Sequence, residues 1–391
     1  MKKVILKKEA LEKITLYNPW IYNREIKDIP KDVKSGEVVE IVSHRGDFLG
    51  IGYINPKSKI TVRVLTFEKE DIDIQFFVKR IKKAVEKREE IFKTSNGVRI
   101  IHSEADGLAG LIADYYDGYI SLQINTAGME NFRDTILESL IEVLKPKAIV
   151  EKSDSKSRLV EGLETEEKVL YGEVPGSIVI VENGVKFKID LITGQKTGFY
   201  LDQRANREKV SKYVKKGFKV LDLFSNTGGF GIYTALKGAE FVKFVDISEN
   251  AVSLIYENLK LNNIDNFEIK RADVFDFVKE ELKSGLKYDI IVLDPPPFAK
   301  SKNEKEGALR GFKYLILNSL KLLNENGYLA VFSCSHHITY EDLINTTLDS
   351  LKDTKTKAQY IEYLTQDTDH PYIINIPSTL YLKGFILQKV R

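Results

Sequence analysis

The hydrophobic and polar positions of the chain follow three successive patterns. Up to about residue 70, short β-branched runs alternate with Gly, Asn and Pro, which predicts strands joined by tight turns. The next part mixes strand-like runs with an amphipathic stretch at 130–144, which predicts a helix. From about residue 191 onward, strand and helix patterns alternate, as they do in a parallel sheet. We therefore predict three domains, at 1–70, 71–190 and 191–391.

The first two segments carry clear strand and turn signals. Their β-branched runs predict a small closed β-barrel in the first segment. A helix-like run at 79–92 marks the boundary to the central α+β segment. That segment closes with a hairpin around Asn183-Gly184, because this pair supplies the positive φ angles of a tight hairpin turn. The strand candidates are 38–42, 48–53, 60–65, 119–124, 148–151, 178–181 and 185–187.

The third segment predicts a doubly wound α/β sheet of seven strands. Helices fit between the first five strands, and Thr339 followed by Asp342 resembles the start of a further helix at 343–351. The last two strands are joined by a Pro-containing loop, which indicates an antiparallel closing hairpin. The strand candidates are 219–222, 241–246, 267–270, 288–294, 327–333, 359–364 and 380–390.

Composition narrows the class of protein. The 391 residues are 43% hydrophobic, which suffices for two or three cores. The net charge of +2 neither requires nor excludes a polyanionic partner. One cysteine excludes an internal disulfide, and five scattered histidines show no zinc spacing, so we expect no metal. The amino-terminal apolar run is too short for a signal peptide, and no membrane helix is evident, so we expect a soluble, cytoplasmic protein.

The most informative motif is the strand, turn and helix start that begins at Val220. A phosphate-binding turn would present bare backbone N–H groups and avoid a carboxylate beside the anion, but here Asp222 ends the strand. A ligand with a cationic amine and a sulfonium, such as S-adenosylmethionine, favours a carboxylate there. We therefore expect this cofactor, and a methyltransferase. The predicted cofactor-binding residues of the turn are Asp222, Phe224, Asn226, Thr227, Gly228 and Gly229.

Three further acids lie where predicted strands end, and strand carboxyl ends share one edge of the sheet. Asp246 is placed to accept hydrogen bonds from a ribose, and Asp273 from an adenine amino group. Asp294 completes the series on the fourth strand. The alternative is that an individual Asp here is a helix N-cap or a solvated turn residue.

Asp294 is followed by three prolines and Phe298. Proline fixes φ and donates no backbone hydrogen bond, so this run predicts a rigid shelf at the strand tip. Asp294 would hold the edge of a planar base and Phe298 its face, and Pro295 of the shelf is a further predicted RNA contact. The alternative is a plain strand terminator.

The lone cysteine, Cys334, lies at the tip of the fifth strand, next to the shelf strand. Its thiol is therefore within reach of the same cleft, although a single Cys is ordinarily a small hydrophobic residue. His336 and His337 follow in the same loop. They are either plain loop residues or one of them acts as a catalytic base.

Four basic residues are candidate RNA contacts. Arg204 and Arg207 lie three apart on a predicted helix, after Lys196, and would bind the RNA backbone or the cofactor carboxylate. Pairing with Asp202 and Glu208 is the alternative. Lys300 lies in a basic loop after the shelf, which suits phosphate binding as well as plain solvation.

With these residues in place, the chain resembles the ribosomal RNA cytosine-C5 methyltransferases that carry an N-terminal PUA domain, class I S-adenosylmethionine-dependent enzymes. The resemblance spans nearly the whole chain. The matching stretches are Asn18-Pro19-Trp20-Ile21-Tyr22, 50–58, 104–111, 193–207, Asp222-Leu223-Phe224 and Asp294-Pro295-Pro296.

The resemblance implies that Cys334 is the nucleophile, adding to cytosine C6 so that C5 attacks a methyl group. Asp294 would stabilise the base as it is protonated at N3. Many cytosine-C5 enzymes have a second cysteine beside the strand-four acid, whereas this chain has Pro295, so the base that removes the C5 proton stays unassigned.

The expected function is therefore methylation of a cytosine in large-subunit ribosomal RNA. The alternatives are methylation of a guanine or adenine nitrogen by the same fold, and a non-catalytic RNA-binding assembly factor. A nicotinamide dehydrogenase is disfavoured, because the turn lacks Gly-x-Gly-x-x-Gly. The target nucleotide, the state of the RNA substrate, the role of the central domain and the oligomeric state, a homodimer included, stay open.

Overall fold

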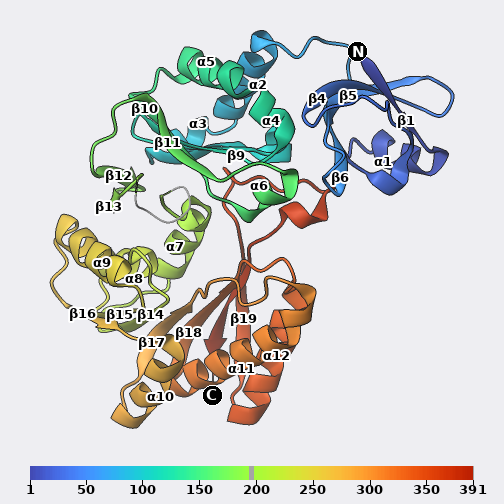
Figure 1. The fold of residues 1–391 in the computed structure, drawn as a ribbon. Helices are drawn as coiled ribbons and strands as arrows, with labels where there is room; N and C mark the ends of the chain where they lie inside the picture. The colour runs from blue at the N-terminus through green and yellow to red at the C-terminus, as the bar shows by residue number, and fades with distance from the viewer. Residues whose placement is uncertain (193–197, 391) are drawn as a thin grey trace. The chain divides into compact units, whose positions relative to one another are not determined.

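The computed structural model describes residues 1–192 and 198–390 (Figure 1). Two compact units account for these residues, and each combines separate stretches of the chain. The first comprises 1–183, 189–201 and 368–377, and the second 184–188, 202–367 and 378–391. The predicted barrel and central segment thus share one unit, and the division into three domains stays a prediction.

The first unit opens with a six-stranded sheet in the order β2-β6-β5-β4-β1-β3. Strands β1 and β4 pair in parallel, and the remaining neighbours are antiparallel. Alternating side chains such as Val39 and Ile41 point into its core. The elements are β1 (Lys2–Leu6), η1 (Lys8–Ala10), α1 (Leu11–Thr15), β2 (Trp20–Tyr22), η2 (Asn23–Glu25), β3 (Ile26–Asp28), β4 (Glu37–Val42), β5 (Phe48–Ile54) and β6 (Ile60–Thr66).

A second sheet of the same unit has the order β11-β10-β9-β8-β7. Helices α2 and α5 pack against each other (Figure 1). Their apolar side chains share a core with this sheet. Sequence patterning did not predict β7 or β11. The elements are α2 (Ile74–Glu86), α3 (Glu89–Phe92), β7 (Gly97–His102), η3 (Ser103–Asp106), β8 (Leu111–Tyr116), β9 (Tyr119–Ile124), α4 (Ala127–Asn131), α5 (Arg133–Leu144), β10 (Ala148–Ser153), α6 (Lys156–Glu161) and β11 (Glu166–Gly172).

Helix α2 begins five residues earlier than the sequence pattern predicted. The Asp73 side chain accepts a hydrogen bond from the Phe76 N–H at 3.0 Å, which satisfies one free donor of the first turn. The helix ends at Glu86, and the short α3 follows it. The predicted run therefore comprises two helices.

The hairpin at the end of the central segment is present as predicted. Strands β12 (Ile178–Glu182) and β13 (Val185–Ile189) flank the turn. Asn183 and Gly184 have φ angles of 49° and 85°, which is the left-handed region that this turn requires.

The second unit contains a seven-stranded sheet in the order β16-β15-β14-β17-β18-β20-β19. The first five strands are parallel, and β20 is antiparallel to both β18 and β19. The elements are η4 (Leu201–Gln203), α7 (Arg204–Ser211), β14 (Lys219–Leu223), α8 (Gly229–Leu236), β15 (Phe241–Asp246), α9 (Glu249–Leu261), β16 (Phe267–Arg271), α10 (Val274–Ser284), β17 (Tyr288–Leu293), η5 (Lys302–Glu304), α11 (Lys305–Leu322), β18 (Leu323–Ser333), α12 (Tyr340–Thr354), β19 (Ala358–Thr365), η6 (Pro377–Thr379) and β20 (Lys383–Lys389).

Helices cover both faces of this sheet. Helices α10, α11 and α12 lie along one face (Figure 1). Their apolar residues form one large core with side chains such as Leu221, Leu293 and Val331. Helices α8 and α9 contact β14, β15 and β16. The doubly wound α/β fold predicted from the sequence is confirmed, and so are the closing hairpin of β19 with β20 and the Thr339–Asp342 capping box of α12. Among the described residues, no helix is long and apolar enough to cross a membrane.

Candidate active site

The turn after β14 holds the first predicted site residues. Asp222 is 1% exposed, and its Oδ2 accepts a hydrogen bond from the Gly231 N–H in the first turn of α8 at 2.9 Å. Phe224 and Asn226 adopt φ angles of 60° and 49°, an uncommon conformation for residues with a side chain. A backbone held in this way is a feature of functional loops.

Small residues let the turn pack closely against its neighbours. Gly228 has a φ of 81°. A Cβ on Gly229 would lie 2.8 Å from Cδ of Arg207, so glycine leaves room for the arginine. The Thr227 carbonyl accepts a hydrogen bond from Asn258 Nδ2 of α9 at 3.0 Å, which fixes the turn from the far side.

Asp246 ends β15, and Asp273 lies two residues beyond the end of β16, at the same edge of the sheet. Asp246 is half-buried and accepts hydrogen bonds from the N–H groups of Asn226 and Ser248, both at 2.9 Å. Asp273 is exposed and is the N-cap of α10, where it accepts from the Phe275 N–H at 2.8 Å. The N-cap alternative therefore holds for Asp273, and its contact with adenine stays a prediction.

The acids of this edge influence one another. Burial raises the pKa of Asp222 to about 7, and the charges of Asp294 and Asp246 add to the effect, while the Gly231 hydrogen bond and Arg207 oppose it. Carboxylates that repel one another are stabilised when a cation binds beside them. The residues present thus fit a ligand that carries an amine and a sulfonium, and Asp222, Asp246 and the turn backbone would hold it.

Asp294 directly follows β17 and is half-buried. Its Oδ2 accepts a hydrogen bond from Nε2 of Gln203 at 3.0 Å. Gln203 is 3% exposed, and its own Oε1 accepts from Asn206 Nδ2 at 2.6 Å. Sequence reasoning missed Gln203, although it lies in the stretch that resembled the family most closely.

The two ends of the proline shelf are covered, while Pro296 and Pro297 are exposed. Pro295 is buried, and Phe298 is half-buried. The Phe298 ring contacts Phe312 with centroids 5.1 Å apart, and also Phe275 and Phe224 at 5.9 and 6.2 Å. These contacts account for Phe298 as a packing residue, and its stacking on a base stays a prediction.

Cys334 follows β18, whose parallel neighbour β17 leads to Asp294, so the two residues end adjacent strands. The thiol is partly exposed. Lys383, the first residue of β20, lies opposite Ser333 of β18 and is 7% exposed. Its Nζ donates a hydrogen bond to the Ser335 carbonyl at 2.6 Å. Burial lowers the pKa of Lys383 to about 8, and the charge of the Cys334 thiolate opposes that shift. Nothing in the sequence pattern indicated Lys383.

The four predicted basic contacts differ in their surroundings. Arg204 is 3% exposed and forms an ion pair with Asp367 at 2.9 Å, rather than with Asp202. Arg207 is equally buried, beside the turn glycines. Lys300 is exposed, whereas Lys196 lies outside the described residues. Burial disfavours phosphate contacts by the two arginines and leaves Lys300 available for one.

Comparisons with known proteins agree with this fold. The PUA-like domain family matches residues 4–67, and the S-adenosylmethionine-dependent methyltransferase family matches residues 163–342. A solved S-adenosylmethionine-dependent methyltransferase fold from Streptococcus mutans aligns with a TM-score of 0.85 at 24% identity, over 99% of this chain and all of that one. A methyltransferase solved with S-adenosylhomocysteine aligns with a TM-score of 0.84 at 25% identity, over 99% and 100% of the two chains.

The fold and the site define an S-adenosylmethionine-dependent methyltransferase with a PUA-like domain. Proteins named ribosomal RNA large subunit methyltransferase I are 39% identical in Shewanella frigidimarina, over 94% of both chains, and 40% identical in Aliivibrio fischeri, over 95% and 96%. The chain belongs to this methyltransferase I family. The predictions of fold and cofactor are confirmed; the roles of individual site residues are not tested by these comparisons.

Proposed function

We propose that the protein methylates C5 of a cytosine in large-subunit ribosomal RNA through a covalent adduct with Cys334. The observation that carries this proposal is the placement of a partly exposed thiol and a carboxylate at the ends of adjacent parallel strands, β18 and β17. A nitrogen methyltransferase needs a carboxylate or carbonyl at the shelf but has no use for the thiol.

Cys334 and Asp294 would act at different steps of the methyl transfer. The Cys334 thiolate adds to C6 of the base, which gives C5 the electron density to form a bond to carbon. S-adenosylmethionine supplies the electrophilic methyl group for that bond. Asp294, oriented by Gln203, stabilises the base protonated at N3 while density moves through the ring. Loss of the C5 proton then expels the thiolate and restores the aromatic ring.

Lys383 supports the thiolate in this scheme. A thiol reacts as its anion, and a nearby ammonium lowers the cost of forming that anion. The Lys383 Nζ is held by the Ser335 carbonyl, one residue beyond Cys334. We therefore assign Lys383 as a positioning residue that keeps positive charge beside the sulfur.

The base that removes the C5 proton stays unassigned. Pro295 occupies the place where a second cysteine follows the strand-four acid in many cytosine-C5 enzymes, and proline has no group that accepts a proton. Solvent or a histidine of the loop after Cys334 are the candidates.

The choice of ribosomal RNA rests on the relatives and on the PUA-like domain. The relatives' names specify the large ribosomal subunit. A PUA-like domain next to a methyltransferase domain supports an RNA substrate, since the catalytic domain then needs no large basic surface of its own.

The test is transfer of labelled methyl from S-adenosylmethionine to unmodified ribosomal RNA, with the product identified by nucleoside. Wild type and Cys334→Ala are compared with Ser335→Ala, a neighbour that lacks a thiol. We expect label in 5-methylcytidine that disappears only in Cys334→Ala. Label in a purine, or a fully active Cys334→Ala, would refute the cytosine-C5 mechanism. Tight cofactor binding without turnover on any RNA would favour an assembly factor instead.

A further inference from the structure

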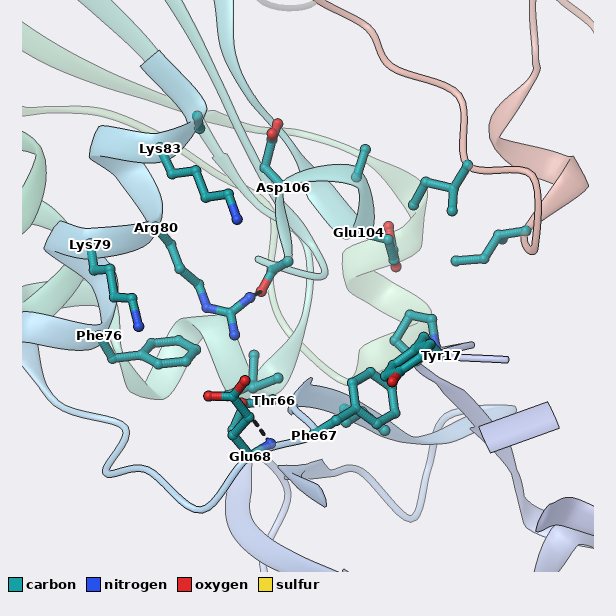
Figure 2. Close-up of a pocket in the computed structure, with 18 of the residues that line it drawn as sticks. Tyr17, Thr66, Phe67, Glu68, Phe76, Lys79, Arg80, Lys83, Glu104 and Asp106 are labelled. Carbon is teal, nitrogen blue, oxygen red and sulfur yellow. Dashed lines mark hydrogen bonds between the residues drawn. The ribbon is translucent and has the colours of Figure 1, made fainter. Parts of the chain in front are cut away.

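A pocket of about 550 Å³ lies within the first unit. Helix α2 forms one wall, and the end of β6 with the loop after it forms another, while η3 and residues 373–376 complete it. Figure 2 shows Lys79, Arg80 and Lys83 extending from α2 on one side and Tyr17 with Phe67 on the other. The volume suits a nucleotide-sized group. We call this cavity the α2 pocket.

Helix α2 presents an uncompensated positive face to the α2 pocket. Lys79, Lys82 and Lys83 are exposed and lie at helical spacings of three and four, so they share one face. Within the part of the chain that the structure describes, no acidic side chain forms an ion pair with any of these three lysines. A second hollow continues along the same lysines on the outer side of the helix.

Three of the four acids that line the pocket have a partner, and the fourth, Glu68, is exposed. Glu70 lies 3.8 Å from Arg80, which Glu68 also attracts. Asp106 accepts from Arg88 Nη2 at 2.7 Å. Glu104 likewise accepts a hydrogen bond from the indole of Trp20 at 2.8 Å. The four acids and the four basic residues that line the pocket balance in charge, but Lys79 and Lys83 form no ion pair among the described residues. These two lysines favour an anionic ligand on the α2 side of the pocket.

An exposed aromatic side chain stands opposite the lysines. Tyr17 is 67% exposed and has a φ of 57°, which is costly for a residue with a side chain. Its ring contacts Phe67 edge to face, with centroids 5.1 Å apart. The flanking Asn18 Nδ2 donates to the Asn375 carbonyl at 3.1 Å, and Asn375 Nδ2 donates to the Leu16 carbonyl. The residues on both sides of Tyr17 are thus held in place, while its side chain stays largely exposed.

We propose that the α2 pocket binds single-stranded RNA, with a base stacked on Tyr17 and the adjoining phosphates on Lys79 and Lys83. The inference rests on the proposed function in one respect, that the substrate is RNA. An aromatic face opposite unpaired lysines matches the alternation of base and phosphate along a single strand. An acidic peptide would satisfy the lysines but would make no use of the exposed tyrosine ring.

The test is binding of a fluorescein-labelled single-stranded RNA of about 12 nucleotides to the full-length protein, measured by anisotropy across a salt series. Lys79→Ala/Lys83→Ala is compared with Lys279→Ala/Lys283→Ala. The control pair has the same spacing on α10, is exposed, and carries no ion pair within the described residues. We expect the first variant to lose about tenfold in affinity and to flatten the slope of log K against log salt by about 1.4, with no change in the control.

A second variant tests the stacking contact. Tyr17→Ala should weaken binding by roughly tenfold, while Tyr17→Phe, which keeps the ring, should bind as wild type does. Equal binding by wild type, the α2 lysine variant and Tyr17→Ala would refute the inference and leave the proposed chemistry intact. Lysine-dependent binding of polyglutamate in preference to RNA would also overturn it. Absence of methyl transfer together with lysine-dependent RNA binding would refute the proposed function alone.

Discussion

Gln203 donates from Nε2 to Oδ2 of Asp294 at 3.0 Å, although 91 residues separate them in the sequence. The glutamine precedes α7, and the aspartate ends β17. Because the carboxamide of Gln203 is itself held by Asn206, the Asp294 carboxylate has one preferred orientation. The acid assigned to the target base is therefore positioned before any base arrives.

Loss of this hydrogen bond should slow methyl transfer without abolishing cofactor binding. A hydrogen bond to a charged group contributes about 1.5–3 kcal/mol, so Gln203→Ala should lower the single-turnover rate by roughly 10- to 100-fold. Gln366→Ala is the control, since Gln366 is another buried glutamine of this unit whose Nε2 donates to the Thr379 carbonyl at 2.7 Å. Equal rates for the two variants would show that Gln203 has no special role.

Asp222 should make the cofactor-free protein less stable as the pH rises toward neutrality. Its pKa of about 7 in the fold exceeds the ordinary value of 3.8, so between these values the folded state holds a proton that the unfolded state has lost. Each pH unit in this window then lowers the free energy of unfolding by at most about 1.4 kcal/mol. Denaturation at pH 5 and pH 7 should show this loss in wild type and a smaller one in Asp222→Asn. An identical pH dependence in both would contradict the assignment.

Lys383 should control the reactivity of Cys334 toward alkylation. Without the ammonium, the thiol pKa rises, so Lys383→Met should shift the pH profile of alkylation by iodoacetamide upward by about one unit. Lys383→Arg should keep the profile close to that of wild type. Because the pKa of Lys383 is lowered to about 8, the wild-type ammonium loses its charge above that pH.

A matched control exists on the same strand. Lys389 also lies on β20, and its Nζ donates to the carbonyls of Leu320 and Leu323, both at 3.0 Å. Lys389→Met should leave the alkylation profile of Cys334 unchanged. A shift of equal size in both variants would indicate a general loss of structure instead.

At Gly128, replacement by alanine should have the opposite effect on stability from the one usual for a helical glycine. Replacing helical glycine with alanine ordinarily stabilises by about 0.5–1 kcal/mol. Here a Cβ would lie 2.0 Å from Cγ of Tyr53, whose buried ring packs against α4. Gly128→Ala should therefore destabilise the protein by about 1–3 kcal/mol, measured by denaturant unfolding.

The control for this prediction is Gly307 in α11. A Cβ there would meet only Nη2 of Arg310, at 3.8 Å, and the residue is exposed. Gly307→Ala should stabilise the protein slightly. If Gly128→Ala did the same, the close approach of Tyr53 would not be a constraint in solution.

The elements of the second unit were predicted well, because strand-like and helix-like patterns alternate clearly along its sequence. Strands such as β14 and β17 are mostly buried and apolar, with an acid at or just after the carboxyl end, and helices of ordinary length separate them. The edge strand β11 was missed, since its side chains are mostly exposed and carry no alternation of burial. Strand β7 was missed as well; it begins at Gly97, and its burial does not alternate regularly along the strand.

The candidate site was predictable only where local sequence determines position. Asp222, Asp246 and Asp294 follow from strand ends in a parallel sheet. Gln203 and Lys383 act through partners far away in the chain, so neither spacing nor residue type indicates them. The Asp367 partner of Arg204 was likewise not indicated, since it lies 163 residues away in the sequence.

The antiparallel strand β20 lies between β18 and β19, although it is made after both. During synthesis, the β18 edge thus waits for some 50 residues, a delay of several seconds at ordinary elongation rates. An open strand edge is a template for wrong pairing. The nascent chain therefore passes through an aggregation-prone interval, in which β18 is still an unpaired edge strand. During the same interval Cys334 has no lysine beside it.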